Sequence, residues 1–199
     1  MPMADLAIAV LAAGASRRFG STDKLIAPLA GRMLGLHATA TLSGIAAGHR
    51  WVVVPREDHP CAAAWQAQGF AVRVNEQAAS GLGSSVALAA QQARDAGAGA
   101  LLIALADMPC VPAGHFRAVI AAGAEAGVEA LVASTGTAGF RGPPALFGAA
   151  HFLHLAATSG PTGARALLAD AVCIAAPADA LLDVDTPADL DRAALAWGS

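Results

Sequence analysis

The chain is poor in charged residues and in long apolar runs. Only 14% of its 199 residues are Asp, Glu, Lys or Arg, and the formal net charge is −3. A nucleic-acid-binding surface needs a basic face, so this composition argues against a DNA or RNA partner. No apolar run reaches the roughly 18–20 residues that span a bilayer, which argues against a membrane protein. The length predicts a single domain over residues 1–199, with a substantial core.

Cysteine is scarce, and its spacing has neither a disulfide nor a metal signature. The three cysteines, Cys61, Cys110 and Cys173, are odd in number and far apart, so we expect reduced, mostly buried thiols. The first residues lack the cationic segment of a secretory signal. Together these features predict a cytoplasmic protein. His151 and His154 have helical spacing, but no nearby Cys or carboxylate completes a zinc set.

Lysine is almost absent, and the single exception is informative. Lys24 is the only lysine, and it ends a loop, 11–24, that follows a predicted buried strand over residues 6–10. The loop contains small residues, which permit tight turns, and then cations: Gly14, Ser16, Gly20, Arg17, Arg18 and Lys24. Backbone N–H groups and fixed positive charges both favour an anion. The loop therefore predicts a phosphate-binding site.

Apolar runs of strand length alternate with stretches of helical length. We expect strands over residues 6–10, 51–54, 70–74, 98–106, 129–134, 144–147 and 172–174. We expect helices over residues 32–42, 62–68, 86–95, 112–122, 149–157 and 163–169, and a last helix ending near residue 197. This alternation predicts an α/β fold with a largely parallel sheet. Ligands bind such sheets at the carboxyl ends of the strands, so the loops there should converge.

Aspartates supply a second part of the predicted site. Asp107 follows the most apolar stretch of the chain, and Asp183 and Asp185 precede the last helix. The next residues have a helix-capping pattern that explains them without any function: Thr186, Pro187 and Asp189. Mg²⁺ prefers one or two carboxylates plus phosphate oxygens and water, so we predict that Asp107 and Asp185 hold Mg²⁺. A turn or capping role would also explain Asp107 alone.

Cations and Mg²⁺ around a polyphosphate imply phosphoryl or nucleotidyl transfer. A Walker loop has lysine directly after its second glycine, whereas Lys24 stands four residues beyond Gly20. A dinucleotide fingerprint needs a third glycine, and Val86 occupies that position after Gly81 and Gly83. Both a P-loop kinase and an NAD enzyme are therefore disfavoured.

Several motifs, in order over residues 6–191, resemble those of the MobA-like nucleotidyltransferases. Residues 11–24 resemble the signature loop of that family. Asn75 and residues 81–85 resemble its second nucleotide loop, and residues 106–109 resemble its metal-binding Asp-Met-Pro motif. Later motifs resemble the molybdenum cofactor cytidylyltransferase branch: 141–144, 163–165 and 183–187. The chain departs from that branch at two places. Pro161 stands where the family often has Asp, and Val86-Ala87 stand where the family often has Leu-Arg. These departures concern the acceptor more than the reaction.

The resemblance implies a Rossmann-like three-layer α/β/α domain that uses an NTP and Mg²⁺. In the cytidylyl branch, CMP passes from CTP to molybdopterin carrying molybdenum, and pyrophosphate is released. Ala12-Ala13 is similar to that branch, whereas guanylyl relatives more often have Ala-Gly-Gly. The resemblance implies that Arg18, Lys24 and Asp107 are catalytic. The implied nucleotide contacts are Leu11, Ala12, Ala13, Gly14, Ser16, Arg18, Lys24, Asn75, Gly81, Ser84 and Ser85.

Two other functions stay open. A related enzyme would use GTP, or would act on another phosphate acceptor such as a sugar or isoprenoid phosphate. A non-catalytic nucleotide-binding factor for molybdoenzyme maturation would bind NTP and turn nothing over. Two carboxylates favour an enzyme, because binding alone seldom needs a two-carboxylate Mg²⁺ site. A maturation chaperone is a further candidate partner, as the recipient of the product.

Overall fold

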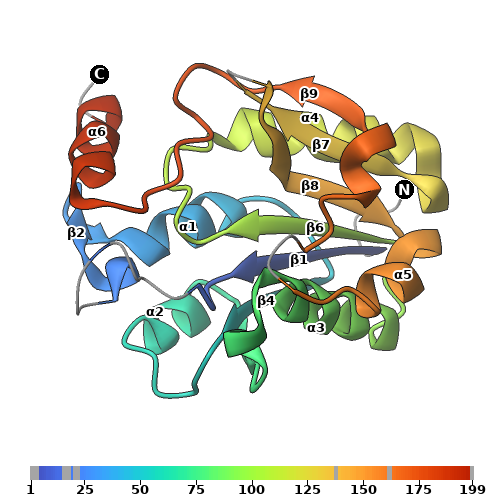
Figure 1. The fold of residues 1–199 in the computed structure, drawn as a ribbon, viewed down its shortest axis with the longest axis horizontal. Coiled ribbons are helices and arrows are strands. Elements are labelled where there is room, and N and C mark those ends of the chain that lie inside the picture. Colours follow the sequence, from blue (N-terminus) through green and yellow to red (C-terminus); the bar gives the residue numbers. More distant parts are fainter. Residues whose placement is uncertain (1–4, 15–18, 20–22, 137–138, 161–162, 198–199) are drawn as a thin grey trace.

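A computed structural model describes residues 5–14, 19, 23–136, 139–160 and 163–197. One seven-stranded sheet runs through the molecule in the order β5-β4-β1-β6-β8-β7-β9 (Figure 1). Its strands are β1 (Leu6–Leu11), β4 (His49–Val54), β5 (Ala71–Val74), β6 (Ala100–Leu105), β7 (Leu131–Thr135), β8 (Arg141–Gly148) and β9 (Val172–Ala175). Only β8 runs antiparallel to its neighbours among these strands. The predicted α/β class with a mostly parallel sheet is confirmed.

Helices cover both faces of the sheet. They are α1 (His37–Ser43), α2 (Ala62–Ala67), α3 (Leu82–Asp95), α4 (Ala113–Ala126), α5 (Phe152–Ala156) and α6 (Pro187–Trp197). Side chains alternate along β1, so Ile8 faces the layer that holds Trp65 and Phe116, whereas Ala9 faces Val86 and the α3–α5 layer. Both faces of β1 are therefore buried, which explains why its sequence is a continuous apolar run.

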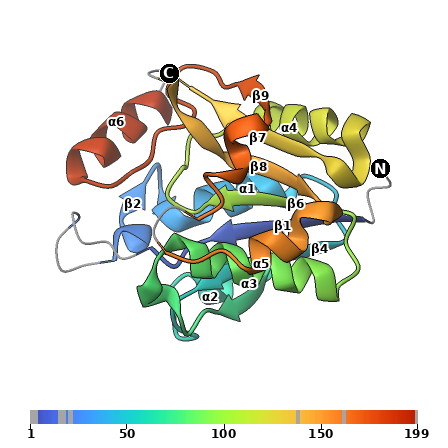
Figure 2. The ribbon, with the colours of Figure 1, turned by 45° about the vertical axis from the view of Figure 1, so that its right-hand side comes forward.

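The last helix lies apart from these layers. In both views α6 sits beside β2 (Pro28–Leu29), beyond the end of the main sheet (Figures 1 and 2). A small separate cluster of Leu29, Leu34, Val184 and Ala193 holds it there. None of the described helices is long and apolar enough to cross a bilayer.

Three predicted helices differ most from the structure. The expected helix over 32–42 begins only at His37, because β3 (Arg32–Met33) first pairs with β2 across a turn with positive φ at Ala30 and Gly31. Residues 163–169 contain no α-helix, only the start of a 3₁₀ turn over Leu167–Asp170. Helix α3 begins at Leu82 rather than at residue 86. Its N-cap, Gly81, has φ +112°, a backbone conformation that favours glycine.

The cysteines also differ from expectation in their burial. No disulfide joins the three residues, and Cys61 is buried, but Cys110 is half-buried and Cys173 is exposed. Cys173 is exposed because β9 is an edge strand that pairs only with β7.

The first turn of α3 packs directly on the segment that follows α5. The Gly83 N–H donates to the Gly160 carbonyl at 2.9 Å, and Thr158 Oγ1 donates to the Gly83 carbonyl at 3.2 Å. A Cβ atom on Gly83 would lie 2.5 Å from the Ser159 carbonyl carbon. Glycine is therefore required where these two backbones meet.

Gly83→Ala should lower the free energy of unfolding by about 1–3 kcal/mol, because a backbone segment must move to accept the methyl group. Urea denaturation measures this change. The matched control is Gly114→Ala near the start of α4, where no atom lies within 4 Å of the added Cβ. An unchanged midpoint for Gly83→Ala would contradict the close approach.

Candidate active site

Lys24 and three aspartates meet at the carboxyl edge of the sheet. The Lys24 Nζ lies 2.7 Å from Asp107 Oδ2, 2.8 Å from Asp185 Oδ1 and 3.8 Å from Asp183 Oδ1. The lysine side chain is only 7% exposed. Asp107 follows β6, whereas the other two aspartates precede α6, so the cluster joins three distant parts of the chain.

A main-chain hydrogen bond brings the two acidic segments together. The Val184 N–H donates to the Asp107 carbonyl at 3.0 Å, and the Val184 side chain is fully buried. In an extended segment, neighbouring side chains point to opposite sides. Burial of Val184 therefore directs Asp183 and Asp185 together toward Asp107 and Lys24.

The predicted capping pattern at α6 is confirmed. The Thr186 N–H donates to Asp189 Oδ2 at 2.9 Å, and the Asp189 N–H donates to Thr186 Oγ1 at 3.2 Å. Hydrogen bonds from Thr186 hold the pKa of Asp189 below its usual value. This cap starts the helix immediately after Asp185 and ends the acidic segment.

One ammonium faces three carboxylates in this cluster. Burial opposes the charged form of Lys24, but the negative charge of Asp107 and hydrogen bonds to Asp107 and Asp185 outweigh it and raise the lysine pKa. Partial burial and then the charge of Asp107 raise the pKa of Asp183 to about 7, against the opposing effect of Lys24. The cluster therefore has an excess of negative charge.

The donor set fits a divalent cation. Oxygen atoms of the three aspartates lie within 4.8 Å of one another. Asp107 Oδ1 is buried and has no hydrogen-bond partner among the described residues, so it retains a lone pair that a cation would satisfy. The metal pair predicted from the sequence was Asp107 and Asp185, and the structure adds Asp183 to it. The alternation of two aspartates about a buried valine was the signal for it.

Asn75, Ser84 and Ser85 form one buried hydrogen-bond network. Asn75 Nδ2 donates to Ser84 Oγ and to Ser85 Oγ, both at 2.9 Å, and Asn75 Oδ1 accepts from the Gln77 N–H at 3.0 Å. Ser84 Oγ also lies 2.8 Å from the Gly81 carbonyl. The network fixes the segment between β5 and α3, so these predicted nucleotide contacts come from a rigid element.

The first predicted loop is described only in part. The Ala12 N–H donates to the Val53 carbonyl at 2.8 Å, and the Leu11 carbonyl accepts from the Ala106 N–H at 3.0 Å. Ala13 is half-buried and Gly14 is exposed at the edge of the sheet. Four predicted loop residues lie outside the described residues: Ser16, Arg17, Arg18 and Gly20. Of the predicted phosphate-binding cations, the structure therefore places Lys24 alone.

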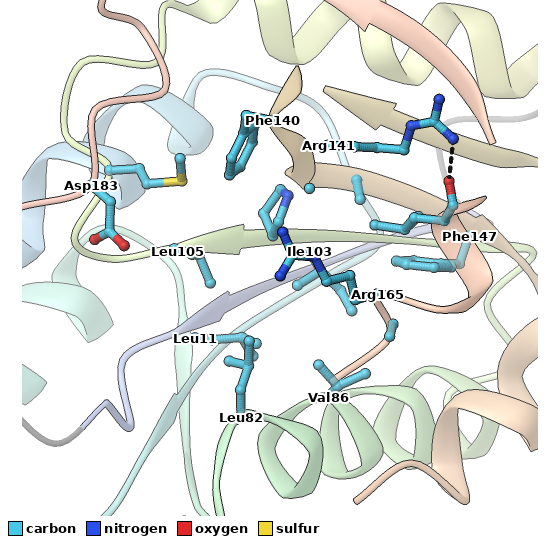
Figure 3. A pocket seen from close by; sticks show the side chains of 16 residues that line it. Leu11, Leu82, Val86, Ile103, Leu105, Phe140, Arg141, Phe147, Arg165 and Asp183 are labelled. Carbon is cyan, nitrogen blue, oxygen red and sulfur yellow. Dashed lines mark hydrogen bonds between the residues drawn. The ribbon is translucent and has the colours of Figure 1, made fainter. Parts of the chain in front are cut away.

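A largely apolar cavity of about 290 Å³ lies next to the acidic cluster. Leu82 and Val86 of α3 line one side and Phe147 of β8 another, and Asp183 stands at one end (Figure 3). The Arg165 guanidinium points into the cavity, whereas Arg141 points away and donates to the carbonyls of residues 168 and 169. Sequence reasoning matched both arginines to family motifs but did not separate these roles.

Comparison with known proteins assigns the family. The model of the MobA-like NTP transferase domain matches residues 8–178. The chain belongs to the MobA-like NTP transferase family. It is 33% identical over 195 residues to the purine catabolism protein PucB of Bacillus subtilis, covering 91% of this chain and 92% of that protein. The predicted family is thus confirmed, and the protein is a nucleotidyltransferase by family and fold.

Solved structures show the same fold at lower identity. Rv0371c of Mycobacterium tuberculosis is 23% identical with a TM-score of 0.71, covering 98% of this chain and all of that one. Its complex with manganese superposes with a TM-score of 0.68 at 22% identity, covering 96% and 98% of the two chains. Molybdopterin-guanine dinucleotide biosynthesis protein A of Archaeoglobus fulgidus is 18% identical with a TM-score of 0.65, covering 96% and 98%.

Asp183→Asn should stabilise the metal-free protein at pH 8 by about 1 kcal/mol and have almost no effect near pH 4. The unfolded carboxyl ionises near its ordinary pKa of 3.8, whereas the folded one ionises near 7. Stability is therefore lost as the pH rises through this window. The expected gain is discounted because the side chain is 48% exposed.

Urea denaturation in EDTA at the two pH values measures this difference. Asp179→Asn is the control. That carboxylate is 65% exposed and makes an exposed ion pair with Arg192 Nη2 at 3.7 Å. Equal effects of Asp183→Asn at both pH values would refute the raised pKa.

Proposed function

We propose that this protein transfers CMP from CTP to the molybdopterin cofactor that carries molybdenum, and releases pyrophosphate with the help of Mg²⁺. The observation that carries the proposal is the position of the acidic cluster. It lies between the loop that ends at Lys24 and an apolar cavity that contains Arg165. A nucleotidyltransferase needs such an arrangement, because charged phosphates of two substrates must meet at one point.

The reaction joins an acceptor phosphate to the α-phosphorus of the nucleotide. An acceptor phosphate is already ionised at neutral pH, so the chain needs no strong base, and positioning and charge neutralisation supply the rate. Arg18 and Lys24 would attract the triphosphate, and Lys24 already stands among the carboxylates. Asp107, Asp183 and Asp185 would hold Mg²⁺, which supplies charge neutralisation when it is bound.

The acceptor would enter the cavity beside Asp183. Its apolar lining favours a fused ring system over a hydrated sugar. Arg165 makes no hydrogen bond or ion pair within the described part of the chain, so its guanidinium is available for an anionic group of the acceptor. The name of one structural neighbour, molybdopterin-guanine dinucleotide biosynthesis protein A, supports a nucleotide-modified molybdopterin product.

Base selection would come from the two predicted nucleotide loops. Hydrogen bonds hold the main chain at Leu11 and Ala12 and the hydroxyl groups of Ser84 and Ser85. Ala12-Ala13 at the first loop favours cytosine in the cytidylyl branch that the motifs resemble. The structure of the related Rv0371c with manganese supports the use of a divalent cation, and Asp107, Asp183 and Asp185 are the donor set that would hold one here.

Pyrophosphate release with CTP or GTP, in the presence and absence of molybdopterin cofactor, tests this function. We expect release only with the cofactor, and at least ~10-fold higher kcat/KM for CTP than for GTP, which is about 1.4 kcal/mol of discrimination. A preference for GTP would assign guanylyl transfer instead. Binding of CTP without turnover on the molybdopterin cofactor would reject the proposed acceptor.

Lys24→Ala and Asp107→Ala should each lower kcat by at least ~10²-fold, or about 3 kcal/mol of transition-state stabilisation. Steady-state kinetics on folded variants, checked by circular dichroism, measures the loss. Asp95→Ala provides the matched control, because it removes an exposed carboxylate at the last residue of α3. Near-wild-type turnover in either site variant would reject the proposed mechanism.

A further inference from the structure

A buried histidine outside the acidic cluster contacts the residue next to Lys24. The His59 side chain is 1% exposed, and its Nε2 lies 2.9 Å from Asp23 Oδ2. One face of its ring stacks on Trp65, with ring centroids 4.7 Å apart. Nothing in the proposed reaction uses this histidine, yet the fold buries its polar ring.

The surrounding hydrogen bonds determine which nitrogen of His59 carries the proton. The Cys61 N–H donates to His59 Nδ1 at 3.1 Å, so Nδ1 accepts and carries no hydrogen in the neutral ring. The remaining proton is on Nε2 and points to Asp23. His59 is thus a donor of fixed direction, because Trp65 and Cys61 both hold its ring.

Asp23 connects this donor to the turn that carries Lys24. Its Oδ2 accepts from His59, whereas its Oδ1 accepts from the Leu25 N–H at 3.0 Å and caps the 3₁₀ turn Lys24–Ile26. Each oxygen of this carboxylate therefore accepts a hydrogen bond, one from the buried His59 ring and one from the start of the turn. The next residue, Lys24, then reaches Asp107 and Asp185.

We propose that His59 and Asp23 are positioning residues that hold the ammonium of Lys24 in place. A lysine side chain has several rotatable bonds, so its ammonium is placed accurately only when the backbone of its turn is held. The His59–Asp23 pair supplies this restraint from a position 36 residues away in the sequence. The expected effect on catalysis rests on the proposed nucleotidyl transfer, whereas the expected effect on the position of the Lys24 ammonium does not.

The single lysine makes this proposal directly measurable. Protein grown with lysine labelled with ¹⁵N at Nζ has one labelled group, because Lys24 is the only lysine in the chain. In the substrate-free wild-type protein at pH 6, we expect one ammonium signal with protons that exchange slowly with water. In His59→Leu the exchange should accelerate roughly tenfold, as expected when a cap is lost and the turn opens more often.

Three variants separate positioning from general stability. His59→Gln keeps an N–H donor for Asp23 and should retain most of the wild-type signal. Asp23→Ala should reproduce the effect of His59→Leu, and serves as the second test if the leucine variant does not fold. His115→Leu is the matched control, because His115 is also buried and its Nε2 lies 2.8 Å from the Ser134 hydroxyl, away from Lys24.

An unchanged Lys24 signal in both His59→Leu and Asp23→Ala would overturn the proposal, as would an equal change in His115→Leu. The kinetic consequence is checked separately in the pyrophosphate assay. There, His59→Leu should lower kcat at least roughly fivefold with little change in KM for CTP, and His59→Gln should restore it. Failure of the assay with every acceptor would reject the proposed function and leave the NMR result intact.

Discussion

The ion pairing of Lys24 with three aspartates is the interaction on which the site depends. These groups come from the turn after the first loop, the end of β6 and the segment before α6. Removing the lysine would leave three neighbouring carboxylates without their shared counter-charge, so that they repel one another. The same excess of negative charge makes the cluster suitable for a divalent cation.

The sheet places this cluster through its strand order. β1 and β6 are central, parallel neighbours, so the loops that follow them emerge at the same edge. The antiparallel strand β8 and the turn near Arg165 then complete a cavity beside them. Leu11 at the end of β1, Leu82 at the start of α3 and Asp183 of the acidic cluster all line this cavity, so these described parts of the predicted site share one edge of the sheet.

Much of this arrangement could be predicted from local patterns. The apolar run of β6 before Asp107 and the capping pattern at Thr186 and Asp189 act over a few residues, and both are confirmed. The early start of α3 was missed because Gly83, Ser84 and Ser85 are small or polar enough to suit a loop, whereas contact with the segment after α5 stabilises the helix there. The alternation of Asp183 and Asp185 indicates that both share one face, but the predicted metal pair left out Asp183, which the structure places 3.8 Å from the Lys24 ammonium.

The sequence by itself determined the α/β class, the family, and the meeting of Lys24 with Asp107 and Asp185 at one edge of the sheet. These follow from periodicity and from short motifs, which depend only on nearby residues. The tertiary structure decided which carboxylates contact Lys24, which arginine faces the cavity and how His59 reaches the lysine turn through Asp23. Such contacts join residues far apart in the chain, so they are settled by packing and main-chain hydrogen bonds rather than by local preference.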